Sequence, residues 1–182
     1  MTDLYHDIAN IINREICDSE ETYDGFLRRL AEGNLTREEN NLTHFCVFFL
    51  PYNPADKKVF IGDHKKSGLW LSPGGHIEKD ERLVKALNRE IGEELGVKDF
   101  FRESEAKPFL LTISHIGEEM RHYDIWFLMK TDGADFIVDP GEFYEARWMT
   151  IEEAEKMKTS PPNLAALKVI EYKRKGPARM KP

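Results

Sequence analysis

The sequence predicts a fold of the α/β class, α+β in type, in which helices cover both faces of a mixed β-sheet. Three observations predict it. β-Branched and aromatic segments recur over residues 42–150, amphipathic helical segments interrupt them irregularly, and two more helical segments precede the first strand. We expect a helical extension over residues 1–40, a main domain over 41–175 and a basic tail over 176–182.

The helical extension is predicted from two apolar faces with helical spacing. The first face consists of Leu4, Ile8, Ile11, Ile12 and Ile16, and the second of Tyr23, Phe26, Leu27, Leu30 and Ala31. Gly33-Asn34 predicts the end of the second helix, and Thr36 with Glu39 has the pattern of a capping box. Both apolar faces must be covered, and contact between two copies in a homodimer is one way to do so.

Strands are predicted from segments rich in β-branched and aromatic residues. "LTHFCVFFLPY" is expected to end at Pro51, "KKVFIGDH" is a second strand, and "PFLLTISHI" and "MRHYDIWFLMK" form a hairpin around Gly117. "EARWMT" predicts a last short strand. Thr150 is expected to cap a helix at "IEEAEKM", and a further helix runs from about Asn163 to Lys173.

Composition limits the range of functions. The chain has 182 residues and a net charge of −7, which argues against a nucleic-acid partner because such proteins are usually basic. No apolar run approaches the roughly 18–20 residues that span a bilayer, and the polar start does not predict a signal peptide. Cys17 and Cys46 show no metal-ligand spacing. We therefore expect a cytoplasmic protein with reduced thiols and no membrane partner.

Acidic residues crowd the segment "GHIEKDERLVKALNREIGEELGV", Gly75 to Val97, which holds six carboxylates. On a helix from about Asp80 to Leu95, Glu90, Glu93 and Glu94 cluster at i, i+3 and i+4. This cluster lies beside an apolar stripe of Val84, Leu87, Ile91 and Leu95. Each exposed pair of like charges costs roughly 0.2–0.5 kcal/mol.

Two interpretations of this acidic cluster are open. It is either a solvated face neutralised by Arg89 or a site for a hard cation such as Mg²⁺. Pro73-Gly74-Gly75, just before the helix, favours the cation, because glycines let a backbone carbonyl and a phosphate approach closely.

The same segment fills every position of a known signature. Gly75, Glu81 and the run from Arg89 to Val97 match the pattern G-x5-E-x7-R-E-U-x-E-E-x-G-U, where U is aliphatic. The chain therefore resembles the Nudix hydrolases over roughly residues 42–160; the first forty residues lie outside the family's common core. The resemblance implies an α/β/α sandwich with a mixed sheet. It also implies water attack at phosphorus in a nucleoside diphosphate derivative, with Mg²⁺ or Mn²⁺.

The resemblance also implies roles for individual residues. Glu90 and Glu94 would be the principal metal ligands, Glu93 a further or water-mediated ligand, and the carbonyl of Gly74 would complete the site. Arg89 and Glu81 would form an orienting salt link. Glu90 and Glu93 would act in catalysis mainly through the metal.

The general base comes from the box helix or from the later loop "VDPGEFYEARW" in such proteins. That loop offers Glu142 and Glu145. We favour Glu142, which follows a glycine and precedes the last strand, and the alternative is an ordinary surface acid.

Other residues are candidates for binding a small nucleoside diphosphate-type substrate. Lys65 and Lys66 either contact phosphate oxygens or lie in a solvated turn, Gly75 leaves room for a phosphate, and Asp124 is expected to reach into the cleft. Trp70 is interpreted as core packing, with a base-stacking platform as the alternative. His115 and His122 are expected to face each other across the hairpin as polar or cleft-lining residues, because zinc would need a third ligand.

Two functions remain open. One is a metal-dependent nucleotide pyrophosphohydrolase, and the other is a non-catalytic nucleotide-binding or sensor module on the same fold. The intact acids favour the enzyme. Messenger-RNA decapping is disfavoured, because the net charge of −7 offers no basic path for RNA.

Overall fold

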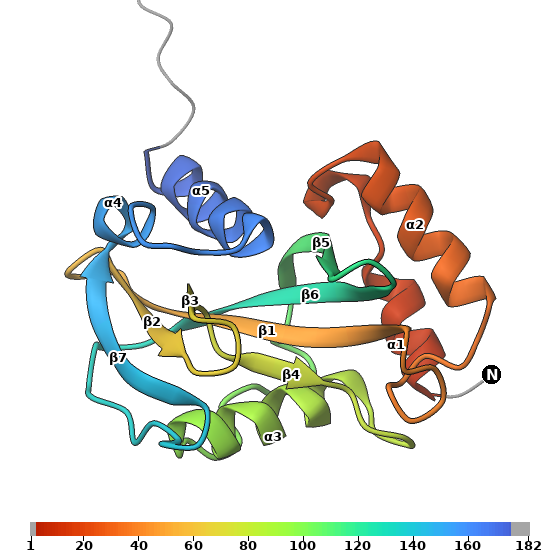
Figure 1. Cartoon of the computed structure of the whole chain (residues 1–182), viewed down its shortest axis with the longest axis horizontal. Coiled ribbons are helices and arrows are strands. Elements are labelled where there is room, and N and C mark those ends of the chain that lie inside the picture. The colour runs from red at the N-terminus through yellow and green to blue at the C-terminus, as the bar shows by residue number, and fades with distance from the viewer. Residues whose placement is uncertain (1–2, 176–182) are drawn as a thin grey trace, which may run out of the picture.

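A mixed seven-stranded sheet forms the centre of the protein in the computed structural model, which describes residues 3–175 (Figure 1). The elements, in chain order, are α1 (Asp3–Ile11), η1 (Arg14–Ile16), α2 (Glu20–Ala31), β1 (Thr43–Asn53), β2 (Lys58–His64), β3 (Leu69–Leu71), β4 (Gly74–His76), α3 (Leu83–Leu95), β5 (Pro108–Ile116), β6 (Met120–Lys130), β7 (Phe143–Thr150), α4 (Ile151–Ala154) and α5 (Pro161–Lys175). The expected basic tail, 176–182, lies outside the described residues.

The sheet has the strand order β3-β2-β1-β6-β5, with β4 added to β1 and β7 added to β2. β1 and β6 are parallel and every other pair is antiparallel, so the predicted mixed sheet is confirmed. The predicted hairpin of β5 and β6 turns at Gly117, which has a φ of 65°.

Alternate residues of β1 face two separate cores, as the two-residue period of a strand requires. Phe45, Val47 and Phe49 face the core under α3. Leu50 and Tyr52 belong to a second core with buried residues of α4 and α5. Figure 1 shows α3 on one face of the sheet and α4 and α5 on the other, so the predicted sandwich is confirmed.

The N-terminal helices share a core with α3. Leu4, Ile8 and Phe26 are at most 5% exposed and belong to the same buried cluster as Ile91. The first predicted helix is shorter than expected, because Asn13 ends the helical run and caps η1 by accepting a hydrogen bond from the N–H of Glu15. The extension therefore buries part of each apolar face within this chain, while Leu27, on the second face, stays 43% exposed.

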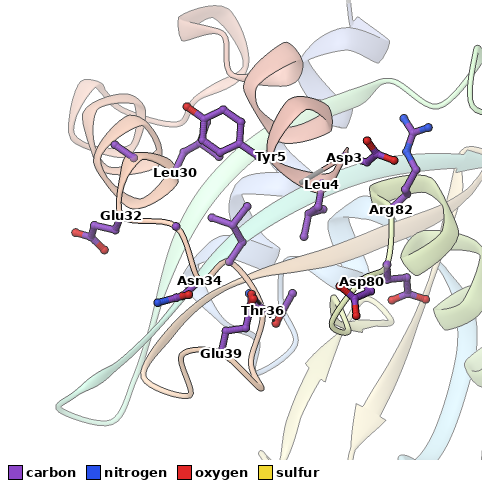
Figure 2. Close-up of a pocket in the computed structure, with 14 residues that line it drawn as sticks. Asp3, Leu4, Tyr5, Leu30, Glu32, Asn34, Thr36, Glu39, Asp80 and Arg82 are labelled. Carbon is purple, nitrogen blue, oxygen red and sulfur yellow. Dashed lines mark hydrogen bonds between the residues drawn. The ribbon is translucent and has the colours of Figure 1, made fainter. Parts of the chain in front are cut away.

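A cavity of about 560 Å³ lies where the extension meets the rest of the chain. Figure 2 shows side chains from α1, from the end of α2 with its following loop, and from Asp80 to Arg82 around it. Gly33 and Asn34 have positive φ (68° and 52°) and end α2 as predicted. Glu39 Oε2 accepts hydrogen bonds from the N–H and the hydroxyl of Thr36, but no helix follows this turn, so the two residues cap none.

Pro51 does not end the first strand, contrary to expectation. The β1–β6 pairing continues through Pro51 to Tyr52. On the other side of β1, β4 pairs with residues 46–48 and β2 with residues 52–53, so Pro51 falls between them. The missing N–H of proline thus breaks no ladder.

Among residues 3–175 no helix has both the length and the apolar character needed to cross a membrane.

Candidate active site

The helix α3 carries the acidic cluster beside the first core. Leu83, Ala86, Leu87 and Ile91 are buried, which places Glu90 and Glu94 at the edge of the core, each only 8% exposed. Gly96 ends the helix in the left-handed conformation with a φ of 70°. The sequence thus buries two carboxylates on one side of one helix.

Two glycines let the helix approach the sheet at this point. The N–H of Gly74 donates a hydrogen bond to Glu94 Oε2 at 3.0 Å. A Cβ atom on Gly75 would lie 2.4 Å from Glu90 Oε1, so a side chain there would displace the carboxylate. Gly74 has a φ of 152°, and a Cβ there would lie 2.4 Å from the backbone carbonyl oxygen of Val47. The backbone therefore requires glycine at position 74, and glycine at position 75 keeps the Glu90 carboxylate in place.

The guanidinium group of Arg89 uses all five of its N–H groups. Nε and one terminal nitrogen bind both oxygens of Glu81 at 2.9 and 3.0 Å. The remaining N–H groups donate to Glu90 (2.8 Å), Glu93 (3.1 Å) and the carbonyl of His76 (2.8 Å). Arg89 thus holds three parts of the chain together: α3, the loop before it, and the glycine strand, which is β4 with Gly74 and Gly75.

Burial leaves the two inner carboxylates with an unfavourable charge. Burial raises the pKa of Glu90, and the hydrogen bond from Arg89 opposes it. Burial raises the pKa of Glu94 well above its ordinary value and the neighbouring Glu90 adds to this, while the Gly74 N–H opposes both. A cation held between these oxygens would remove that penalty. The donors therefore fit a hard divalent ion.

Glu93 is more exposed than Glu90 and Glu94, and it accepts from the same Arg89 nitrogen as Glu90. Its side chain is 57% exposed and pairs with Arg89, four residues before it on the helix. The structure thus brings Glu90 and Glu94 to Gly75 and Gly74, while Glu93 lies in the solvent-exposed part of the cluster and is linked to Glu90 through Arg89.

The loop before β7 lies next to α3. The N–H of Asp139 donates to the carbonyl of Glu94 at 3.1 Å. Glu142 contacts His64 Nε2 at 3.2 Å and Lys66 Nζ at 3.1 Å. Lys65 donates to the carbonyl of Pro140. In this structure both lysines therefore bind the loop. His64 and Asp139 are residues that sequence reasoning missed, and only the position of His64 beside the two lysines could have indicated it.

The structure does not bring Asp124 to a surface cleft. The side chain is 0% exposed and accepts hydrogen bonds from Thr112 and Ser114. Trp70 packs partly buried against the second core, as interpreted from the sequence, with the guanidinium of Arg147 4.9 Å from its ring centre. Glu145 is exposed on β7.

The expected pairing of His115 with His122 is wrong. In the hairpin His122 lies opposite Ser114, and His115 lies opposite Arg121. The two histidines are therefore on opposite faces of the sheet, since neighbouring positions on a strand alternate.

Comparison with known proteins identifies the family. The NUDIX domain matches residues 42–168. An RNA pyrophosphohydrolase from Sphingopyxis alaskensis is 31% identical over 132 residues, which cover 59% of this chain and 84% of that protein. The NAD-capped RNA hydrolase NudC from Deinococcus radiodurans is 29% identical over 108 residues, covering 58% of this chain and 34% of that protein.

Solved structures agree on the fold. The E. coli dihydroneopterin triphosphate pyrophosphohydrolase superposes with a TM-score of 0.60 at 17% identity, over 70% of this chain and 96% of that one. A NUDIX domain of Shewanella oneidensis NrtR, complexed with ADP ribose, gives 0.57 at 15% identity, over 70% and 85%. The chain is a hydrolase and belongs to the Nudix family.

Proposed function

We propose that the protein hydrolyses a diphosphate linkage in a nucleoside diphosphate derivative with a divalent cation, Mg²⁺ or Mn²⁺, in the cytoplasm. Water attacks phosphorus, the phosphoanhydride bond breaks, and a carboxylate takes the proton of the water. A cation bound at the carboxylates would neutralise charge on the diphosphate and lower the pKa of a bound water.

The observation that carries the proposal is the pair of buried carboxylates against a glycine strand. Glu90 and Glu94 are each 8% exposed, and burial raises the pKa of both. Such a pair lowers stability unless a cation is bound, so a binding role explains its presence where a packing role does not. The cost of keeping this buried carboxylate pair also favours a catalytic enzyme over a non-catalytic sensor, which would have no need of the pair.

The chain's own groups divide the remaining tasks in this proposal. Glu90 and Glu94 bind the cation, with the Gly74 carbonyl as a further ligand and Glu93 reached through water or by rotation of its side chain. Arg89 fixes Glu90 through the 2.8 Å hydrogen bond, and Glu81 fixes Arg89 from the other side. Gly75 would serve the substrate site indirectly, because the Glu90 carboxylate occupies the space that its missing Cβ leaves.

We assign the general base to Glu142. Lys66 Nζ contacts one carboxylate oxygen of Glu142 at 3.1 Å and His64 Nε2 contacts the other at 3.2 Å, so the carboxylate is held in one orientation beside α3. Lys65 and Lys66 would turn from the loop to phosphate oxygens when substrate enters. Asp124 is too deeply buried to contact substrate directly, so we propose that it supports the floor of the binding region.

The substrate is proposed to be a small nucleotide. The relatives named for RNA favour a second candidate, a 5′ end of RNA, whereas the net charge of −7 favours small molecules. A panel separates these candidates: ADP-ribose, nucleotide sugars, dinucleoside polyphosphates, nucleoside triphosphates, 5′-triphosphorylated RNA and NAD-capped RNA, each with and without Mg²⁺. Glu94→Gln serves as the inactive variant.

Turnover of the RNA substrates alone would reverse the preference for small molecules. No Mg²⁺-dependent release of a nucleotide or phosphate from any substrate would favour the sensor. Reaction in ¹⁸O-labelled water tests the chemistry, because attack at phosphorus places the label in a phosphorylated product.

A further inference from the structure

Four metal-ligating side chains meet outside the carboxylate site. They are His44, Cys46, His76 and His122, and one donor atom from each lies within 4.8 Å of every other. The ring centres of the three imidazoles are 4.7 to 5.2 Å apart. His44 is 0% and Cys46 1% exposed, and the other two side chains are half-buried.

The register of three strands places these side chains on one face. His44 and Cys46 are two residues apart on β1, so they point the same way. His76 lies opposite Cys46 across the β1–β4 pair, and His122 lies opposite His44 across the β1–β6 pair. Directly opposed residues share a face, so the backbone itself brings the four together.

Two ring nitrogens in the cluster are buried without a partner among the described residues. These are Nε2 of His44 and Nε2 of His122. His44 Nδ1 lies 3.1 Å from the carbonyl oxygen of Asn40. A carbonyl can only accept, so Nδ1 carries the proton and Nε2 of the neutral ring presents a lone pair to the cluster. A carbonyl behind a metal-binding histidine is the usual support of such a ligand.

We infer that these four side chains bind one Zn²⁺ ion, separate from the cation of the carboxylate site. Three imidazoles and one thiolate are ligands that zinc prefers, whereas Mg²⁺ prefers oxygen. Four protein ligands fill a tetrahedral ion and leave no position for substrate, so the ion is structural.

The geometry needs only a small contraction. Zn–N bonds of about 2.0–2.1 Å and a Zn–S bond of about 2.3 Å place tetrahedral ligands about 3.3–3.6 Å apart. The donor atoms, at most 4.8 Å apart here, reach that separation by side-chain rotation of about 1 Å. The thiol proton of Cys46 passes to solvent as the Zn–S bond forms, and neutral imidazoles release none.

Plain packing explains the cluster less well. A buried stack of apolar or aromatic residues would fill the same space without orphaned polar atoms, each of which lowers stability. Asp124, opposite Cys46 on β6, has a further buried oxygen without a partner, Oδ1. One Zn²⁺ and one thiolate sum to +1, which a carboxylate at Asp124 would balance.

The ion would hold the glycine strand in place. His76 contributes its imidazole to the cluster and its carbonyl to Arg89, at 2.8 Å. Zinc would thus join β4 to β1 and β6 on one face of the sheet, while Arg89 holds the same residue from the other side.

The test uses the full chain, purified under reducing conditions, with excess Mg²⁺ present to occupy the carboxylate site. We expect one zinc per chain by elemental analysis. We also expect Co²⁺ substitution to give the visible bands of a tetrahedral ion and a near-ultraviolet thiolate-to-cobalt band. A zinc-selective chelator should lower the melting temperature, and added Zn²⁺ should restore it.

Matched variants assign the ligands. Cys46→Ser should abolish the thiolate band, whereas Cys17→Ser, which changes the only other cysteine, should keep it. His122→Ala should lower zinc affinity at least tenfold, whereas the exposed His115→Ala should not. Circular dichroism tests whether each variant is folded. If a variant is unfolded, the cobalt spectrum of the wild-type protein still decides whether a thiolate binds the metal.

Three results would overturn the inference. They are a folded wild-type protein without a cobalt thiolate band, a band that survives Cys46→Ser, and zinc binding that Glu94→Gln removes while Cys46→Ser does not.

Discussion

The carboxylate of Asp7 accepts hydrogen bonds from Arg82 Nε at 3.0 Å and from the backbone N–H of Leu83 at 3.2 Å. Leu83 is the first residue of α3, and Arg82, its N-cap residue, makes no side-chain capping bond. A side chain from α1 therefore supplies the missing cap of the helix that carries the acidic cluster. The N-terminal extension is connected to the candidate active site by this residue.

Asp7→Asn should lower stability at neutral pH. The hydrogen bond from Arg82 lowers the pKa of Asp7, against the opposing effect of burial. A lowered folded-state pKa contributes stability above the ordinary value, and that stability is lost as the pH falls through the folded value. We expect a loss of about 1 kcal/mol at pH 7 and a shrinking difference between wild type and variant below about pH 4. Urea unfolding of both proteins measures this, and a difference that does not depend on pH would contradict it.

Removal of residues 1–40 should lower the melting temperature and leave the metal ligands in place. Leu4, Ile8 and Phe26 are buried in the core shared with α3, so their loss uncovers apolar surface of the remaining chain. The melting temperature and the oligomeric state of both chains test this, because exposed surface also promotes association. An unchanged melting temperature would show that the helices contribute little to that core.

Glu94→Gln should lower turnover at least a hundredfold while the protein stays folded. A neutral amide is a poor ligand for Mg²⁺, and the Gly74 N–H would lose its charged acceptor. The rate at saturating Mg²⁺ with the panel's best substrate measures the loss. Glu118→Gln, in the exposed hairpin turn, is the matched control and should keep full activity.

Millimolar Mn²⁺ or Mg²⁺ should raise the melting temperature by a few degrees, and more at higher pH. Burial raises the pKa of Glu94, so the folded state binds more protons than the unfolded state above the ordinary glutamate value. Metal-free stability therefore falls as the pH rises, and a cation removes that loss. Binding at a hundred times Kd stabilises by about 2.7 kcal/mol. With excess Zn²⁺ already bound, Glu94→Gln should show no Mn²⁺ response; an unchanged response would place the ion elsewhere.

Gly75→Ala should lower activity, while the variant still unfolds in one cooperative transition. A Cβ there would lie 2.4 Å from Glu90 Oε1, so the carboxylate must move from the glycine strand. Gly68→Ala is a control at an exposed turn with open space around it: its φ of 61° strains the backbone, but no carboxylate has to move, so it should lose stability and keep activity. Full activity of Gly75→Ala would mean that Glu90 does not act from its present position.

Local patterns predicted the fold well because each depends on neighbours in sequence. The limits of β6 follow from the apolar run, and the capping box of Thr150 with Glu153 follows from the identities of those residues. The short strand β4 could not be predicted, because Gly74 and Gly75 have no strand preference and pair with β1 only in the folded sheet.

The candidate site was predicted only where one helix and one loop contain it. The positions of Glu90 and Glu94 follow from the spacing on α3. The ion pair of the exposed Glu93 with Arg89 does not follow from that spacing alone, because Arg89 also binds Glu81 and Glu90. Likewise His44, His76 and His122 are far apart in the chain, and only the registers of β1 with β4 and β6 bring them together.

The parallel pairing of β1 with β6 fixes an order of events during synthesis. β1 is complete at Asn53, but its central partner does not end until Lys130. The apolar faces of α1 and α2 likewise wait for α3, which ends at Leu95. A ribosome adds about 5–20 residues per second, so the first third of the chain stays uncovered for several seconds. The nascent chain is therefore open to chaperones and to aggregation until β6 emerges, and slow translation of residues 54–120 would lengthen that exposure.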